Sequence, residues 1–204
     1  MHRPAVAVLA ALAVVCVTLV LCVTVAGAAA PPGPAAPPKK IYVELRTSAG
    51  PITLELWNDV APTTVRNFVN YVIEGQYDGT IFHRVVKGFV VQGGGYTAEH
   101  SEKPTHDPIP AEFKAKNAKY TIAMARQPGP DSARAQFFIN LRDNANLDPG
   151  GAFPCAVFGR VTAGQAVVDQ IGALPVEDHT KDLGAAFASL PTTVVRIEKA
   201  RVLM

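Results

Sequence analysis

The chain has 204 residues, of which 49% are hydrophobic, 18% charged and 7% aromatic, and its formal net charge is +2. This length suits one globular domain with a short extension, and the balance of apolar and charged residues excludes an intrinsically disordered chain. No basic excess accumulates along the chain, which argues against electrostatic binding of nucleic acid. Three cysteines are too few for a disulfide scaffold.

The first residues have the pattern of a secretory signal peptide. Residues 5–26 carry no charge and are almost wholly Ala, Val and Leu; Arg3 precedes them and small residues follow. We predict that residues 1–28 are a signal peptide cleaved after Ala28. The alternative is an uncleaved membrane anchor, because about 20 apolar residues can span a bilayer. The protein is therefore expected to be periplasmic or secreted, and a membrane-anchored form is the less favoured alternative.

Residues 29–40 are predicted to be a spacer. Ala, Pro and one Gly make up residues 29–38, a composition typical of an extended, semi-rigid segment. Cleavage of the signal peptide removes Arg3 and no acid, so the net charge becomes 18 minus 17, or +1. Cleavage also removes Cys16 and Cys22, so Cys155 would remain alone and no internal disulfide could form.

Residues 41–204 have the pattern of a single β-rich domain. Apolar residues alternate with polar ones over 41–45 and 52–56, which predicts a β-hairpin with one buried face. A helix is predicted from a cap at Asp59, through Pro62 in its first turn, to a stop at Gly75, and a second near 164–171. Further strands are expected at 80–86, 89–92, 121–125, 136–141, 156–161 and 193–202. Many short strands with few helices favour a β-sandwich or a closed barrel.

One predicted strand carries an arginine on an apolar face. Alternation over residues 82–86 places Phe82, Arg84 and Val86 on one side, and His83 and Val85 on the other. Such an arginine has two interpretations. It is a rim residue whose guanidinium reaches water or pairs with a carboxylate, or its guanidinium is held over an apolar surface to bind an acceptor. The pattern alone favours the rim residue.

Adjacent aromatic residues and scattered histidines leave similar alternatives open. Phe137 and Phe138 must point to opposite faces of a strand, so one is expected in the core and the other is packed or lines an apolar pocket. A metal site built from His100, His106 and His179 is a weak alternative, because their spacing matches no familiar ligand pattern. We therefore expect no metal and no cofactor.

Taken together, several segments resemble the cyclophilin family of peptidyl-prolyl cis-trans isomerases. The matching motifs are FHRVVKGFVVQGG at 82–94, TIAMAR at 121–126, QFFIN at 136–140 and VFGRV at 157–161, preceded by the start of the first helix at 59–68. The arginine at 126 and the loop at 130–133 are most similar to the bacterial secreted branch. The resemblance implies a mainly β fold, a closed eight-stranded antiparallel β-barrel capped by two α-helices, with the substrate groove on the outside of the barrel.

The resemblance also implies the site. Arg84 matches the essential catalytic arginine, and Gln92 matches the side chain that orients it. The substrate-binding residues implied are Phe89, Val90, Ala125, Arg126, Gln136, Phe138, Leu147 and Cys155. His83 is expected to contribute local packing and hydrogen bonding.

Three features depart from the family pattern. Asn146 replaces an aromatic residue that helps to bind cyclosporin, Cys155 replaces a His or Tyr, and the 148–154 segment is longer than usual. We expect catalysis to survive and cyclosporin binding to be weakened, with Phe153 a candidate replacement for the missing aromatic.

The expected function is isomerisation of Xaa-Pro bonds in unfolded or newly exported polypeptides, by a non-covalent mechanism in a monomer. The alternative is a catalytically weak module that binds proline-containing or unfolded segments.

Overall fold

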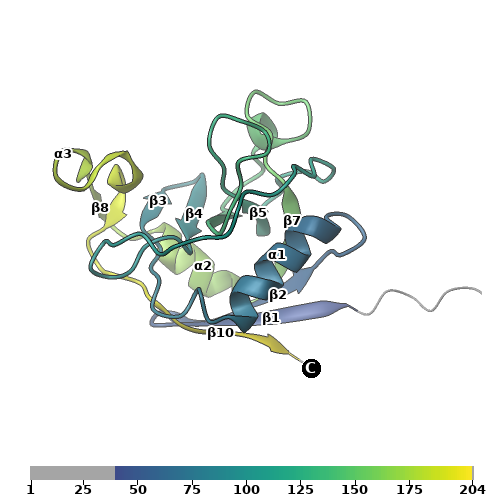
Figure 1. Cartoon of the computed structure of the whole chain (residues 1–204). Helices are drawn as coiled ribbons and strands as arrows, with labels where there is room; N and C mark the ends of the chain where they lie inside the picture. Colours follow the sequence, from purple (N-terminus) through teal and green to yellow (C-terminus); the bar gives the residue numbers. More distant parts are fainter. Residues whose placement is uncertain (1–39, 204) are drawn as a thin grey trace, which may run out of the picture. The chain divides into compact units, whose positions relative to one another are not determined.

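A computed structural model describes residues 40–203 of the chain (Figure 1). The predicted signal peptide, its cleavage site and the spacer up to Lys39 lie outside these residues. Within the described range no helix is both long enough and apolar enough to cross a membrane.

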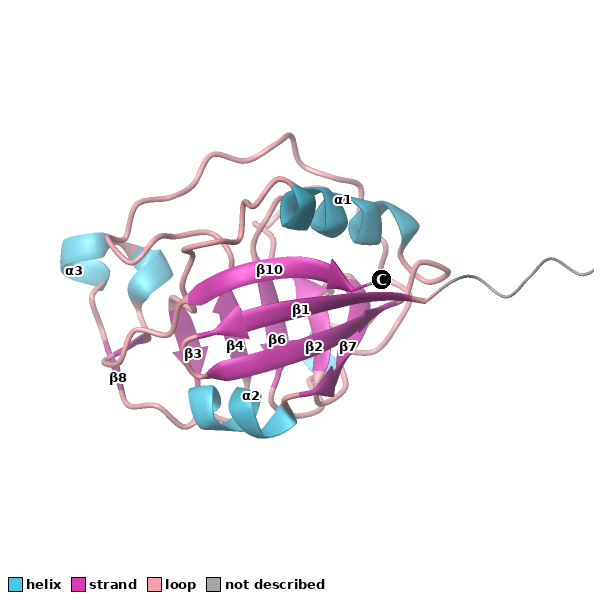
Figure 2. Ribbon diagram, turned by 90° about the horizontal axis from the view of Figure 1, so that it is seen from below, coloured by secondary structure: helices cyan, strands magenta, loops and turns pink. Residues whose placement is uncertain are grey.

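Eight antiparallel strands form one strongly curved sheet. In chain order they are β1 (Ile41–Thr47), β2 (Gly50–Leu56), β3 (Arg84–Val86), β4 (Val90–Gly93), β5 (Thr121–Met124), β6 (Phe137–Asn140), β7 (Val157–Ala163) and β10 (Ile197–Leu203). Their order in the sheet is β10-β1-β2-β7-β5-β6-β4-β3. Figure 2 shows the sheet curling around the core as a half-barrel.

The predicted closure of the barrel is not confirmed. Strands β3 and β10 are the two edges of the sheet and do not pair with each other. Between the segment that precedes β3 and the residues at the start of β10, the structure has an isolated bridge from Ile81 to Arg196 and three backbone hydrogen bonds. These run from the Gly79 amide to the Ile197 carbonyl at 2.8 Å, from the Ile197 amide to the Thr80 carbonyl at 2.7 Å, and from the Phe82 amide to the Val195 carbonyl at 3.0 Å. Strand β3 itself is only three residues long and takes no part in these contacts, so no ladder joins β3 to β10.

The predicted hairpin is confirmed. Strands β1 and β2 pair in register, with Val43 opposite Leu54 and Leu45 opposite Ile52, and all four side chains are fully buried. Period-two alternation therefore places one face of the hairpin in the core. The turn between the strands depends on Gly50, whose φ of +127° is a conformation that other residues rarely adopt.

Both predicted helices are present, at opposite ends of the curved sheet (Figure 2): α1 (Pro62–Ile73) and α2 (Gln165–Gly172). The prediction that Asp59 caps α1 is wrong. The residue before the helix is Ala61, which has no side-chain acceptor. Instead, the Glu112 carboxylate accepts hydrogen bonds from the Thr63 amide at 3.2 Å and the Thr64 amide at 2.8 Å. A residue 48 positions away from Thr64 thus satisfies the first amides of the helix.

Short elements occupy segments for which the sequence predicts neither a helix nor a strand. They are η1 (Ala145–Leu147), β8 (Val176–Glu177), α3 (Thr180–Leu183), η2 (Ala185–Phe187) and β9 (Leu190–Pro191). With two to four residues each, they are too short to show a hydrophobic period. Two of their residues, Phe187 and Leu190, are buried in a small cluster with Ile81.

The sheet separates two apolar clusters. Phe137 lies in the main core, where it packs edge-on against Phe68 and Tyr77. Phe138 points to the opposite face of the sheet and lies in a second apolar cluster. The predicted division of these two rings is confirmed. We call the second group the outer cluster; its buried members are Val90, Ala123, Phe138, Leu147, Cys155 and Val157.

The alternation predicted for residues 82–86 is wrong at one position. Phe82 is buried in the main core together with Val85, so it does not share a face with Arg84. The ladder begins at Arg84, and residues 82 and 83 precede it with irregular backbone. Period-two alternation applies only within a strand, which explains the error.

Candidate active site

A row of cross-strand neighbours runs across five strands on the outer side of the sheet. Arg84 on β3 pairs with Gln92 on β4, Gln92 with Phe138 on β6, Phe138 with Ala123 on β5, and Ala123 with Val157 on β7. Directly opposed residues project to the same face of an antiparallel sheet. The register therefore brings one charged, one amide and three apolar side chains into a continuous strip.

A cavity of about 360 Å³ opens over this strip. It is lined by Arg84, Phe89, Val90, Gln92, Ala125, Arg126, Phe138, Asn146, Leu147, Phe153 and Cys155. Every site residue proposed from the sequence except Gln136 is in this lining. The two additional residues, Asn146 and Phe153, belong to the stretch where the sequence departs from the family pattern, and that departure was the one signal that pointed to them.

Arg84 is held at the edge of the cavity by a short chain of amides. Its Nη1 donates to Oε1 of Gln92 at 3.3 Å, and Nε2 of Gln92 donates to Oε1 of Gln136 at 3.0 Å. Burial lowers the pKa of Arg84 from its ordinary value, but an arginine remains charged at any physiological pH. None of the salt bridges among residues 40–203 involves Arg84. A charged donor thus faces an apolar hollow without a carboxylate partner.

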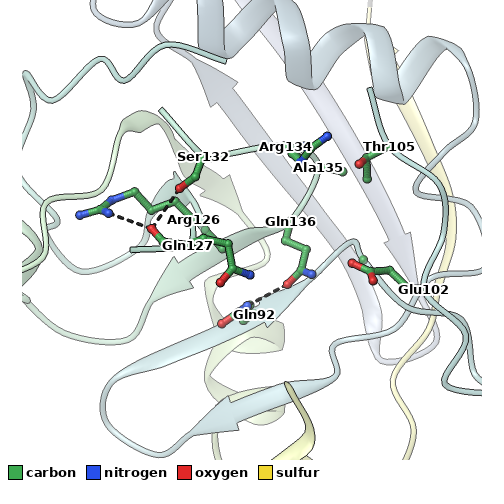
Figure 3. A pocket seen from close by; sticks show the side chains of 11 residues that line it. Gln92, Glu102, Thr105, Arg126, Gln127, Ser132, Arg134, Ala135 and Gln136 are labelled. Atoms are coloured by element: carbon green, nitrogen blue, oxygen red, sulfur yellow. Dashed lines mark hydrogen bonds between the residues drawn. The ribbon is translucent and has the colours of Figure 1, made fainter. Parts of the chain in front are cut away.

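A second, more polar cavity of about 220 Å³ adjoins the first and shares Gln92, Ala125 and Arg126 with it. Gln136 lies here, with its side chain beside that of Gln92, as Figure 3 shows. The remaining lining residues are Gly95, Glu102, Thr105, Gln127, Ser132, Arg134 and Ala135. All predicted site residues therefore surround two connected hollows.

Three buried asparagines position the walls of the larger cavity from behind. Asn117 donates to the carbonyl of Leu147 at 2.6 Å, and Asn144 donates to the carbonyl of Phe89 at 3.1 Å. Asn140 links them, because it donates to Asn117 at 3.1 Å and accepts from Asn144 at 2.7 Å. A fully satisfied buried network of this kind rigidifies its surroundings. The backbone of two cavity walls is thereby fixed.

The one thiol in the lining of the larger cavity is a poor nucleophile. Cys155 is buried, and burial raises the pKa of its thiol to about 11, so it stays protonated near neutrality. The arrangement can instead bind an apolar ring between its walls while the guanidinium donates to an acceptor atom, with little competition from water.

His83 lies behind Arg84 and only half fulfils its predicted role. Its ring packs against Tyr96 and Phe187, with centroids 4.7 and 6.0 Å away. The predicted hydrogen bonding is wrong for the part of the chain that the structure describes, where neither ring nitrogen has a hydrogen-bond partner. The carbonyl of Ile81 and the side chain of Gln136 are its polar neighbours, without suitable geometry. Burial, assisted by the nearby charge of Arg84, lowers the pKa of His83 to about 4. The imidazole is therefore neutral at physiological pH.

The three histidines of the alternative metal site have unrelated surroundings. His106 stacks on Tyr71 and pairs with Glu74 at 3.2 Å, His100 packs on Phe187, and His179 lies 3.4 Å from Glu177. Among residues 40–203 no three His, Cys, Asp or Glu side chains are grouped as metal ligands would be.

Known proteins similar to this chain agree on one family. The family model described as cyclophilin type peptidyl-prolyl cis-trans isomerase/CLD matches residues 42–202. The chain is 48% identical over 167 residues to peptidyl-prolyl cis-trans isomerase cyp18 of Streptomyces antibioticus, covering 79% of this chain and 98% of that one. It is 44% identical over 165 residues to peptidyl-prolyl cis-trans isomerase A of Dickeya dadantii, covering 79% and 84%.

A solved structure has the same fold. The crystal structure of a cyclophilin type peptidyl-prolyl cis-trans isomerase of Cryptosporidium parvum matches with a TM-score of 0.66 at 21% identity, covering 81% of this chain and 98% of that one. A second structure of that protein, determined in the presence of the dipeptide Ala-Pro, matches with a TM-score of 0.65 and covers 80% and 99%. The matches to the family model and to the bacterial relatives show that this chain belongs to the cyclophilin family of peptidyl-prolyl cis-trans isomerases.

Proposed function

We propose that the larger cavity holds the ring of a substrate proline and that Arg84 donates a hydrogen bond to the prolyl nitrogen as the preceding peptide bond twists. The apolar walls Phe89, Val90, Phe138 and Leu147 suit a pyrrolidine ring. The observation that carries this proposal is the position of the Arg84 guanidinium, which is tied to Gln92 at the edge of that cavity.

The chemistry of the reaction explains why one arginine is sufficient. Rotation about a peptide bond must cross about 18–20 kcal/mol, because the C–N bond loses its partial double-bond character in the twisted state. Twisting localises the nitrogen lone pair, which then accepts a hydrogen bond that the planar amide cannot accept. A donor that Arg84 aims at this atom binds the transition state better than either ground state, which is the requirement for catalysis. No bond breaks, and the step requires no general acid or base.

We further propose that Ala125, the backbone of Arg126 and the side chains of Gln136 and Gln92 contact the peptide on one side of the proline. The contiguity of the two cavities supports this proposal, because residues 92, 125 and 126 line both. A peptide held on one side while the other side turns loses less rotational freedom in the transition state.

The expected substrates are Xaa-Pro segments of unfolded or newly exported polypeptides, in the periplasm or outside the cell. The uncharged run at residues 5–26 supports the export. Weak cyclosporin binding is expected from the polar Asn146 in the lining of the cavity.

A peptide isomerisation assay with three proteins tests the proposal. The wild type should accelerate isomerisation of an Ala-Pro peptide, and Arg84→Ala should lower kcat/KM by about a hundredfold to a thousandfold, by analogy with loss of one preorganised oxyanion donor. Arg84→Lys should restore little, since an ammonium lacks the fork that reaches both Gln92 and the substrate.

Unfolding in urea provides the control. Arg84 makes one side-chain hydrogen bond among residues 40–203, to Gln92, so its loss should cost only about 1 kcal/mol of stability. A folded Arg84→Ala variant with wild-type kcat/KM would refute the mechanism. A wild type that binds the peptide without accelerating its isomerisation would favour the binding module.

A further inference from the structure

The side chain of Arg126 is occupied by contacts within the protein. The Cζ atom of its guanidinium lies 3.8 Å from the ring centroid of Phe153, which is cation–π stacking at close range, and 5.5 Å from that of Phe113. Its Nε donates to the carbonyl of Pro154 at 2.7 Å. Both the stacking and this hydrogen bond hold the same segment, residues 153 and 154.

The same guanidinium also holds the loop on its other side. Nη1 of Arg126 lies within hydrogen-bond distance of three carbonyls, those of Gln127 at 2.9 Å, Pro128 at 3.0 Å and Gly129 at 3.2 Å. Figure 3 shows this side chain pointing away from Gln92 and Gln136. Arg126 therefore joins the 127–129 loop to the 153–154 segment, and the Nε and Nη1 donors are committed to backbone carbonyls.

The 148–154 loop brings Phe153 back to the edge of the larger cavity. The amide of Phe153 donates to the carbonyl of Asn146 at 3.0 Å, and the amide of Cys155 donates to the carbonyl of Leu147 at 3.0 Å. Gly151 permits this return, because a Cβ there would lie 2.6 Å from the carbonyl oxygen of Asn146. The aromatic ring thus stands beside Asn146, in the lining that both residues share.

We propose that Arg126 is a positioning residue that holds the Phe153 ring as the outer wall of the proline cavity. Phe153, and not residue 146, supplies the aromatic wall on this side. The ring is 38% exposed, so a bound proline would remove part of its apolar surface from water. This inference rests on the proposed function for the identity of the ligand. The wall contacts the ring in planar and twisted substrate alike, so its loss should weaken binding and leave kcat nearly unchanged.

A double-mutant cycle tests the coupling between the two side chains. Phe153→Ala and Arg126→Ala should each weaken binding of an Ala-Pro tetrapeptide by about tenfold, and the double variant should bind no more weakly than either. Phe153→Tyr, which keeps a ring that can stack, should bind as the wild type does. If Arg126 gripped the peptide directly, the two losses would multiply to about a hundredfold, and that result would overturn the proposal.

A fluorescence signal distinguishes positioning from a general structural effect. Trp57 is the single tryptophan, so Trp57→Phe combined with Phe153→Trp gives a reporter at the wall. Its emission should change on peptide binding, and addition of Arg126→Ala should shift the unliganded spectrum toward that of exposed indole. An unshifted spectrum would overturn the proposal. Gly151→Ala, which obstructs the return of the loop, should reproduce both effects.

Two control variants lie away from the cavities. Leu183→Ala removes a side chain of similar exposure, 37%, on α3, and Arg66→Ala removes an exposed charge on α1. Both should bind peptide as the wild type does. The two proposals fail differently: a wild type that binds peptide without isomerising it refutes the proposed function, whereas an active wild type with unimpaired Phe153→Ala refutes the role of the wall.

Discussion

Gly95 leaves room for the side chain of Gln136, which supports Gln92 and Arg84. A Cβ at residue 95 would lie 2.6 Å from Cγ of Gln136 and 2.7 Å from its Cδ and Nε2. Non-bonded atoms do not approach a Cβ atom this closely, so Gly95→Ala must displace the side chain of Gln136. Because that side chain is flexible, the backbone can stay in place and the variant should fold.

The displacement acts on Arg84 through two hydrogen bonds. Gln136 accepts from Gln92 at 3.0 Å, and Gln92 accepts from Arg84 at 3.3 Å. Loss of one partly buried hydrogen bond costs about 0.5–1.5 kcal/mol. If the misorientation of Gln92 and Arg84 destabilises the transition state by that whole amount, kcat/KM falls by about twofold to thirteenfold. The free energy of unfolding should fall by about 1 kcal/mol.

Peptide isomerisation and urea unfolding of three variants check this reasoning. Gln136→Ala should reproduce the loss of kcat/KM, because it removes the same acceptor. Gly129→Ala is the matched control, since a Cβ there meets nothing closer than Ser132 at 4.0 Å, and it should behave as the wild type. Wild-type kcat/KM in folded Gly95→Ala and Gln136→Ala would refute the role assigned to the amide chain.

Three further predictions concern stability and its pH dependence. Phe138→Ala should lower the free energy of unfolding in urea by about 3 kcal/mol, because Phe138 is only 5% exposed, and it should also weaken peptide binding. A decrease below about 1 kcal/mol would contradict the place of Phe138 in the outer cluster. Burial lowers the pKa of His83 to about 4, so the folded state binds fewer protons than the unfolded state between that pH and about 6.5. This contribution is present above pH 6.5 or so and should be lost on acidification toward pH 4, by about 3 kcal/mol, whereas His83→Leu should lack this part of the pH dependence. Burial raises the pKa of Glu112, but hydrogen bonds from Thr64 and Thr63 outweigh this effect and leave the pKa below its ordinary value. Glu112→Ala should lower the free energy of unfolding by about 1 kcal/mol near neutral pH, as removal of a helix cap does. An unchanged midpoint of urea unfolding would refute that role.

The local sequence pattern was sufficient to predict the longer strands and helices. It also predicted that Phe137 and Phe138 lie on opposite faces of the sheet. Alternation over 41–45 and 52–56 predicted the hairpin, because a strand with one buried face must repeat every two residues. The same rule assigned Phe137 and Phe138 to opposite faces. It failed at Phe82, where the backbone is not yet a strand. The alternation alone also favoured a rim position for Arg84, and only the family resemblance implied a catalytic role for it.

Contacts between distant segments decided what the sequence by itself did not. Glu112 caps a helix 48 residues away from it, and the edges of the sheet meet through one bridge and a few hydrogen bonds between residues 79–82 and 195–197. The stacking of Arg126 on Phe153 depends on how two loops return to the cavity. A periodic pattern records which face of an element is apolar, whereas the partner of a polar side chain depends on where the whole chain brings other segments. The sequence therefore determined the strands of the large sheet, the two longer helices, the family and most of the lining of the larger cavity, and only the tertiary structure decided which side chains hold that lining in place.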